Sequence, residues 1–121
     1  MTWVRQCEHM RVMVAERWHQ RTRGLLGRRM LDKSEGMLII PCRSVHTIGM
    51  TYAIDVVFLD SLNTVVSARI ALDPCRCAMD SRACAVLELA PGTIARLGIG
   101  VGDTVAMEMS GVAGAVRGVT T

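Results

Sequence analysis

Four side chains that could bind or react stand within apolar stretches of this sequence: His46, Met50, Asp55 and Glu88. An unpaired buried carboxylate is costly, so Asp55 must meet solvent, backbone donors or a cation. Polar groups that converge in an apolar region mark ligand sites. We therefore expect a binding groove beside His46, Met50 and Asp55. Glu88 is expected as a neighbour of that groove.

These residues also have a structural interpretation. A carboxylate at the start of a strand can accept backbone N–H bonds, as buried polar groups usually do. This is the favoured interpretation of Asp55. A lone histidine on an apolar strand face, such as His46, is more often a hydrogen-bonded core residue than a catalyst.

Cys42 and His46 form a candidate pair of nucleophile and base by residue type. Four residues apart in an extended segment, they would be separated by roughly 13 Å unless the chain turns between them. Residues 41–44 could supply that turn, and Asp55 could arrive from an adjacent strand to orient the base. This pair is the basis of an alternative function, a small hydrolase or a thiol-dependent enzyme.

The other cysteines and the glycines predict no metal and no cofactor. Cys75 and Cys77 have a single residue between them, whereas structural zinc sites usually separate paired cysteines by two to four residues. The glycines of residues 98–103 are two apart and lack the G-x-G-x-x-G spacing of nucleotide sites. Unrelated thiols and a structural turn are the favoured interpretations, and a disulfide is the alternative if the protein is exported.

The charge of the chain does not demand a nucleic-acid partner. The net charge is +3, a mild imbalance that permits contact with anions. Five arginines fall within residues 17–29, but Trp18 is the single Trp, Tyr or Phe among them, too few to stack on successive bases. We predict a solvated helix face there, and no nucleic-acid binding.

The sequence also predicts no membrane span. No stretch reaches the length of about 18 apolar residues that a spanning helix needs. The N-terminal residues carry charges where a signal peptide needs an apolar core, so we predict a cytoplasmic protein with reduced thiols.

The elements that must position these side chains centre on a hairpin. Residues 54–59 are apolar and β-branched or aromatic, which favours a strand. Both faces of this strand are apolar apart from Asp55, so it is expected to be central and covered on both sides. Residues 60–63 supply turn chemistry, and residues 64–72 form the returning strand.

Apolar alternation predicts further strands at residues 10–16, 36–40, 45–50, 83–89 and 104–109. Residues 73–82 are expected to be an irregular surface loop, and residues 110–121 are expected to fray.

Two short helices complete the prediction. Residues 17–31 have helical spacing that Gly24 and Gly27 interrupt, and a helix of one or two turns follows Pro91 and ends at Gly98. The predicted fold is mainly β, a compact small sandwich or barrel with two short helices. The length predicts one domain over residues 1–121, with its core at about 10–110.

The assembled pattern resembles the DUF192 family, also called UPF0127, of uncharacterised bacterial and archaeal proteins. The matching stretches are RTRGLLGRRML, EGMLIIPCRSVHTIGM, IDVVFLD, VLELAPGT and GIGVGDTV, in family order. The resemblance implies a small β-rich single domain and no agreed activity. It includes family motif positions at His46, Met50, Asp55, Glu88, Gly92 and Asp103.

We therefore predict a non-enzymatic binding or accessory module with a ligand or protein partner that the sequence does not identify. The thiol-dependent enzyme remains the alternative. A third hypothesis is assembly, because the bare face of Gly24 and Gly27 would let a helix pack closely against a second copy in a homodimer.

Overall fold

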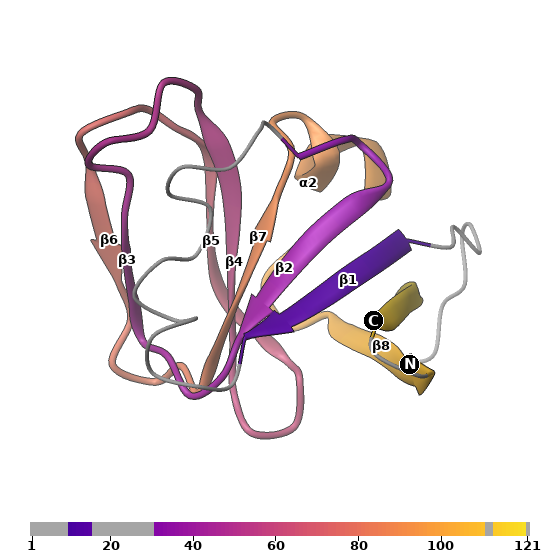
Figure 1. Ribbon diagram of the computed structural model, residues 1–121. Helices are drawn as coiled ribbons and strands as arrows, with labels where there is room; N and C mark the ends of the chain where they lie inside the picture. The colour runs from indigo at the N-terminus through magenta and orange to yellow at the C-terminus, as the bar shows by residue number, and fades with distance from the viewer. Residues whose placement is uncertain (1–9, 16–30, 111–112, 121) are drawn as a thin grey trace.

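Seven strands form one twisted sheet (Figure 1). The computed structural model describes residues 10–15, 31–110 and 113–120. In this part of the chain the sheet has the order β5-β4-β7-β2-β1-β9-β8, and β3 pairs with β6 in a separate two-stranded sheet, here called the β3–β6 ribbon. Neighbouring strands are antiparallel except β1 and β2, which run parallel.

The elements have the following bounds: β1 Met10–Ala15, β2 Glu35–Ile39, β3 Ser44–His46, β4 Ile54–Leu59, β5 Val65–Leu72, β6 Cys77–Met79, β7 Ala85–Leu89, α2 Thr93–Leu97, β8 Thr104–Ser110 and β9 Ala113–Thr120. The prediction of a mainly β fold is confirmed. The helix expected at residues 17–31 falls, apart from Leu31, outside the described residues.

Strand β4 is an interior strand, paired on both sides, and it is buried along its whole length, as its sequence predicts. Because side chains alternate along a strand, its residues divide between two apolar clusters on opposite faces of the sheet. Val57 and Leu59 belong to one cluster, which includes Ile94 of α2. Val56 and Phe58 belong to the other, which includes Val45 of the ribbon.

The hairpin between β4 and β5 is confirmed, and local chemistry explains its turn. Asp60 Oδ1 accepts hydrogen bonds from the N–H groups of Leu62 and Thr64 at 2.8 and 3.0 Å. Asn63 has a φ of 60°, a conformation that asparagine tolerates better than most residues. The side chains of the turn therefore fix the register of the returning strand.

The short helix α2 begins and ends where glycine permits it. Gly92 precedes it with a φ of 90°, and Gly98 follows it with a φ of 68°. Both conformations are strained for a residue with a Cβ atom. The N–H of Gly98 donates to the carbonyl of Ala95, which ends the helix as predicted.

The two edges of the large sheet meet at one end. Thr64 and Thr104 form an isolated antiparallel bridge. The N–H of Val65 donates to the carbonyl of Asp103 at 2.7 Å, beside the start of β8. Within the described residues this bridge ties β5 to β8, but the ladder between them does not continue, so the sheet is not a closed barrel.

Three expectations about the elements were wrong. The strand expected at residues 45–50 ends at His46, because Gly49 turns the chain with a φ of 87°. The loop expected at residues 73–82 contains β6, and the frayed end expected at residues 110–121 contains β9. Both strands are stabilised by partners distant in sequence: β6 by β3, and β9 by β1 and β8.

Candidate functional site

His46 lies at the end of β3, on the outer face of the β3–β6 ribbon. Its cross-strand partner is Cys77, and Ser44 is paired with Met79 on the neighbouring rung. Between these rungs Val45 is buried and packs inward on the apolar cluster around Phe58. Alternation therefore directs the side chains of both outer pairs away from the core.

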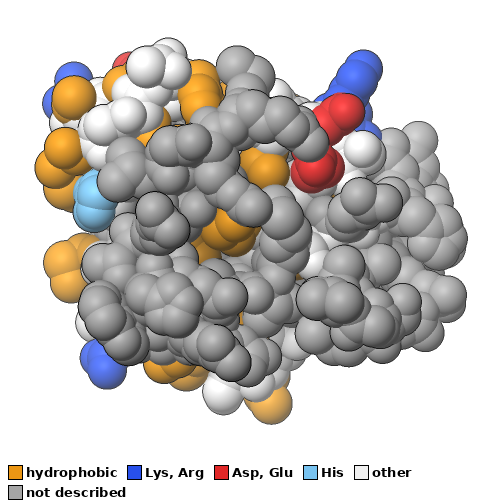
Figure 2. All heavy atoms as spheres, viewed as in Figure 1, with side chains coloured by type: hydrophobic (Ala, Val, Ile, Leu, Met, Phe, Trp, Pro, Cys, Tyr) orange, Lys and Arg blue, Asp and Glu red, His pale blue; other side chains and the backbone are white. Residues whose placement is uncertain are grey.

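These residues line a shallow hollow of about 290 Å³, whose lining is mostly apolar. The lining residues are Ser44, Val45, His46, Cys77, Ala78 and Met79. Met79 is a large hydrophobic side chain that is nevertheless 66% exposed. Figure 2 shows hydrophobic side chains around an imidazole at the left edge of the molecule, over the ribbon.

Thr47 fastens one end of the ribbon. Its side chain is fully buried, and its hydroxyl donates to the carbonyl of Asp73 and accepts from the N–H of Arg76 at 2.8 Å. Its own N–H donates to the carbonyl of Arg76, and its carbonyl accepts from the N–H of Cys75. One buried side chain thus holds the chain before β6 against the chain after β3.

Asp80 and Arg82 fasten the other end. The N–H of Asp80 donates to the carbonyl of Arg43, and its Oδ2 accepts from the Ser67 hydroxyl at 2.7 Å. The guanidinium of Arg82 donates to both carboxylate oxygens of Asp80 and to the carbonyl of Val66. Hydrogen bonds from Arg82, then Ser67, hold the pKa of Asp80 well below its usual value. The ribbon is therefore tied to the edge of β5 through a carboxylate that stays charged.

Met50 does not line the hollow. It is buried in the apolar cluster on the inner side of the ribbon, together with Phe58 and Ile54. The turn around Gly49 reverses the expected alternation, so Met50 faces the core while His46 faces solvent.

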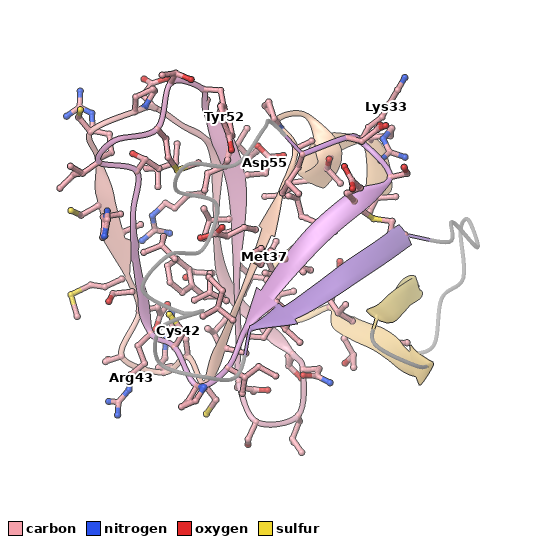
Figure 3. The ribbon with its side chains drawn as sticks, viewed as in Figure 1. Lys33, Met37, Cys42, Arg43, Tyr52 and Asp55 are labelled. Carbon is pink, nitrogen blue, oxygen red and sulfur yellow. The ribbon has the colours of Figure 1, made fainter. Side chains whose placement is uncertain are left out.

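Asp55 is fully buried and occupied by backbone donors. Its Oδ1 accepts from the N–H of Ala71 in β5, and its Oδ2 accepts from the N–H of Ile94 in α2, both at 2.9 Å. Figure 3 places Asp55 at the end of β4 nearest α2. The structural interpretation of this carboxylate, as an acceptor of backbone N–H bonds, is the one that the structure shows.

Glu88 is also buried, with 4% of its surface exposed. It lies on β7 opposite Val56 and Met37, and its Oε2 atom has no hydrogen-bond partner among the residues that the structure describes. Burial raises the pKa of this carboxyl group to about 7. Such a shift is typical of a carboxyl group in an apolar environment.

Asp55 and Glu88 point to opposite faces of the sheet. Asp55 is paired with Leu89, so it shares a face with Leu89, while the preceding residue, Glu88, shares the other face with Val56. The four residues predicted from the sequence therefore occupy three places: the hollow for His46, one face of the sheet for Asp55, and the other for Met50 and Glu88. A binding role for each remains a prediction.

Cys42 and His46, the candidate pair from the sequence, are not cross-strand partners in the ribbon. The thiol of Cys42 donates to the carbonyl of Ser44 at 3.0 Å, near the end of the ribbon where Figure 3 labels Cys42 and Arg43. The residue directly across from His46 is Cys77. No local pattern signals this neighbour, because it depends on pairing between two three-residue strands.

Cys75, Cys77 and Cys84 are exposed thiols outside any disulfide. Among the described residues, no group of three or more His, Cys, Asp or Glu side chains converges in a way that could hold a metal ion. The same part of the chain contains no helix that is long and apolar enough to cross a membrane.

Comparison with known proteins identifies the family. The chain belongs to DUF192, described as "Uncharacterized ACR", whose model matches residues 2–107. A Novosphingobium aromaticivorans protein of unknown function has a similar crystal structure, with a TM-score of 0.72 and 25% identity over 78% of this chain and 73% of that chain. A Sinorhizobium meliloti protein, provisionally described as a transcription regulator, has a TM-score of 0.69 and 30% identity over 77% and 78% of the two chains. No curated protein sequence matches this chain.

Proposed function

We propose that this DUF192 domain is a non-enzymatic binding module whose binding surface is the outer face of the β3–β6 ribbon at His46. The observation that carries the proposal is the apolar hollow of about 290 Å³ beside an exposed imidazole. Exposed apolar surface next to a few polar groups is typical of binding sites.

The size of the hollow indicates what it can hold. Pockets for drug-sized molecules begin at roughly 300 Å³ and enclose most of their ligand. A shallow hollow of about 290 Å³ suits a small ligand or a single anchoring group of a larger partner.

The fastening of the ribbon supports a preformed surface. Thr47 holds one end, and the ion pair between Asp80 and Arg82, with an N–O distance of 2.8 Å, holds the other. A surface that is already ordered loses less conformational entropy when a ligand binds.

The enzyme that the sequence left as an alternative has weaker support. It requires the Cys42 thiol to act with His46, but that thiol is directed to the carbonyl of Ser44. The two buried carboxylates, Asp55 and Glu88, are not among the residues lining the hollow, so neither supports His46 as an orienting group.

We also propose a reducing, cytoplasmic setting. Exposed thiols such as Cys77 are in keeping with it.

The binding surface can be tested with indole as a small apolar probe. We expect it to shift the NMR signals of the Met79 methyl group and the His46 ring in a saturable manner. An affinity in the millimolar range, about −4 kcal/mol, is appropriate for a ligand of this size. The signals of Ile70 and Val101, which are equally exposed elsewhere, should not move.

Two variants make the test specific. Met79→Lys should abolish the shifts of the His46 ring, whereas Leu62→Lys, at an exposed apolar residue outside the hollow, should leave them unchanged. Shifts that are absent, or that gather around Leu62 or Ile70 instead, would contradict the proposed surface.

A further inference from the structure

We propose that the hollow binds a soft monovalent metal ion, copper(I), through the imidazole of His46, the thiolate of Cys77 and the thioether of Met79. This inference depends on the proposed function for its location and goes beyond it by identifying the ligand. It arises from three donor side chains, from two strands, that line one hollow.

The register brings the first two donors together. His46 and Cys77 are directly opposite in the antiparallel ribbon, and Cβ atoms in such a pair are separated by about 4.5–5.5 Å. With metal–ligand distances like those of zinc, about 2.0 Å to nitrogen and about 2.3 Å to sulfur, the two donor atoms must lie roughly 4 Å apart. Rotation about the side-chain torsions of His46 and Cys77 can bring their donor atoms to that separation.

Met79 can supply the third donor. It lies two residues after Cys77 on the same strand, so both side chains project from the same face of the ribbon. Methionine is unbranched and flexible, and Met79 is 66% exposed, so its sulfur atom is free to turn toward the hollow.

The chemistry of these donors selects the ion. Thiolate and thioether ligands favour copper(I), whereas zinc prefers four ligands from cysteine, histidine and carboxylates. The hollow has no carboxylate in its lining, and the described residues contain no cluster of three His, Cys, Asp or Glu side chains. A site with a methionine as its third donor therefore suits copper(I) better than zinc.

The binding step is balanced in charge and atoms. The thiol of Cys77 releases its proton to solvent, and the resulting thiolate forms a bond to the copper(I) ion. Neutral imidazole and thioether lone pairs complete the coordination, and no electron is transferred. The bound site is electrically neutral, which suits its mostly apolar lining.

In the test, copper(I) is added to the reduced protein in oxygen-free buffer as its coloured complex with bicinchoninate. We expect one equivalent to move to the protein, with the Met79 methyl and His46 ring signals shifting together. Cys77→Ser, Met79→Leu and His46→Gln should each weaken binding at least about tenfold. Cys75→Ser and Cys84→Ser replace other exposed thiols, which lie outside the hollow, and should leave copper(I) binding unchanged.

The outcomes separate this inference from the proposed function. If no copper is transferred while indole still shifts the Met79 and His46 signals, the surface stands and the metal inference is wrong. If binding survives Cys77→Ser or is lost equally in Cys75→Ser, the ion is held by surface thiols in general, and the inference also fails. Preferential binding of zinc over copper(I) would overturn the choice of ion.

Discussion

Asp55 and Glu88 are buried carboxylates on neighbouring strands, but they differ in the hydrogen-bond donors that surround them. Asp55 accepts a backbone N–H on each oxygen, from Ala71 and Ile94. Within the described part of the chain, Glu88 has an oxygen without a hydrogen-bond partner. Hydrogen bonds to a buried carboxylate compensate for its lost hydration, whereas an unpaired oxygen leaves that cost in place. Asp55 therefore joins β5 to α2, while Glu88 is a source of instability when it is charged.

Glu88→Gln should stabilise the protein at alkaline pH. The pKa of Glu88 is raised from 4.5 to about 7 in the folded chain, so the unfolded chain releases its proton first as pH rises. The contribution of Glu88 to the free energy of unfolding is complete below about pH 4.5. Between there and about pH 7 it falls by up to about 1.4 kcal/mol per pH unit. The advantage of Glu88→Gln over the wild type should therefore grow between pH 5 and pH 7 and then stay constant.

Urea denaturation at a series of pH values measures this difference. Asp73→Asn, at an exposed carboxylate, is the control and should not change the pH dependence. A constant difference between Glu88→Gln and wild type from pH 5 to pH 8 would show that Glu88 does not titrate within this range in the folded chain.

At the scale of elements, the β3–β6 ribbon depends on its ends. Each strand has three residues, and a short two-stranded sheet is marginally stable by itself. Packing of Val45 and Ala78 onto the apolar cluster supplies part of its stability. Thr47 supplies hydrogen bonds that no other described side chain makes to the carbonyl of Asp73 or the N–H of Arg76.

Thr47→Val should therefore loosen the ribbon selectively. It keeps the shape of the side chain but leaves the N–H of Arg76 without its acceptor, at a cost of about 1–3 kcal/mol. Amide hydrogen exchange should accelerate in β6 and remain slow in β4 and β7. Thr47→Ser retains the hydroxyl and is the matched control. Equal exchange in β6 of the two variants would mean that this hydroxyl does not hold the ribbon.

At the scale of the whole molecule, we expect stability to be concentrated in β4 and β7, two interior strands of the large sheet. Strands β4 and β7 are buried at every position, and their alternating side chains enter both apolar clusters. In the part of the chain that the structure describes, a single bridge between Thr64 and Thr104 joins the edges of the sheet. Loss of packing in the centre should therefore affect the entire fold.

Phe58→Ala tests this distribution. Phe58 is fully buried, and truncation of a buried phenylalanine typically lowers the free energy of unfolding by about 3–5 kcal/mol. Chemical denaturation should show one cooperative transition at lower denaturant concentration. Leu62→Ala, at a turn residue that is 76% exposed, should change stability by less than about 0.5 kcal/mol. A similarly small effect of Phe58→Ala would contradict the central role of β4.

The elements that the sequence predicted correctly depend on information within a few residues. The run of apolar, β-branched residues in β4 predicts a strand covered on both faces. Asp60 and Asn63 predict the turn that follows, and Gly98 predicts the end of α2. Family resemblance adds that this pattern belongs to DUF192, without an activity. Similarity to crystal structures of other proteins supports the same fold.

The sequence by itself determined the central hairpin, the limits of α2 and the residue types available for binding, because propensity, alternation and turn chemistry act locally. Only the tertiary structure decided that β6 exists, that Cys77 lies opposite His46, and that Asp55 and Glu88 face opposite sides of the sheet. These relations depend on pairing register between strands far apart in the chain. A shift of one residue in that register would exchange the two faces of a strand.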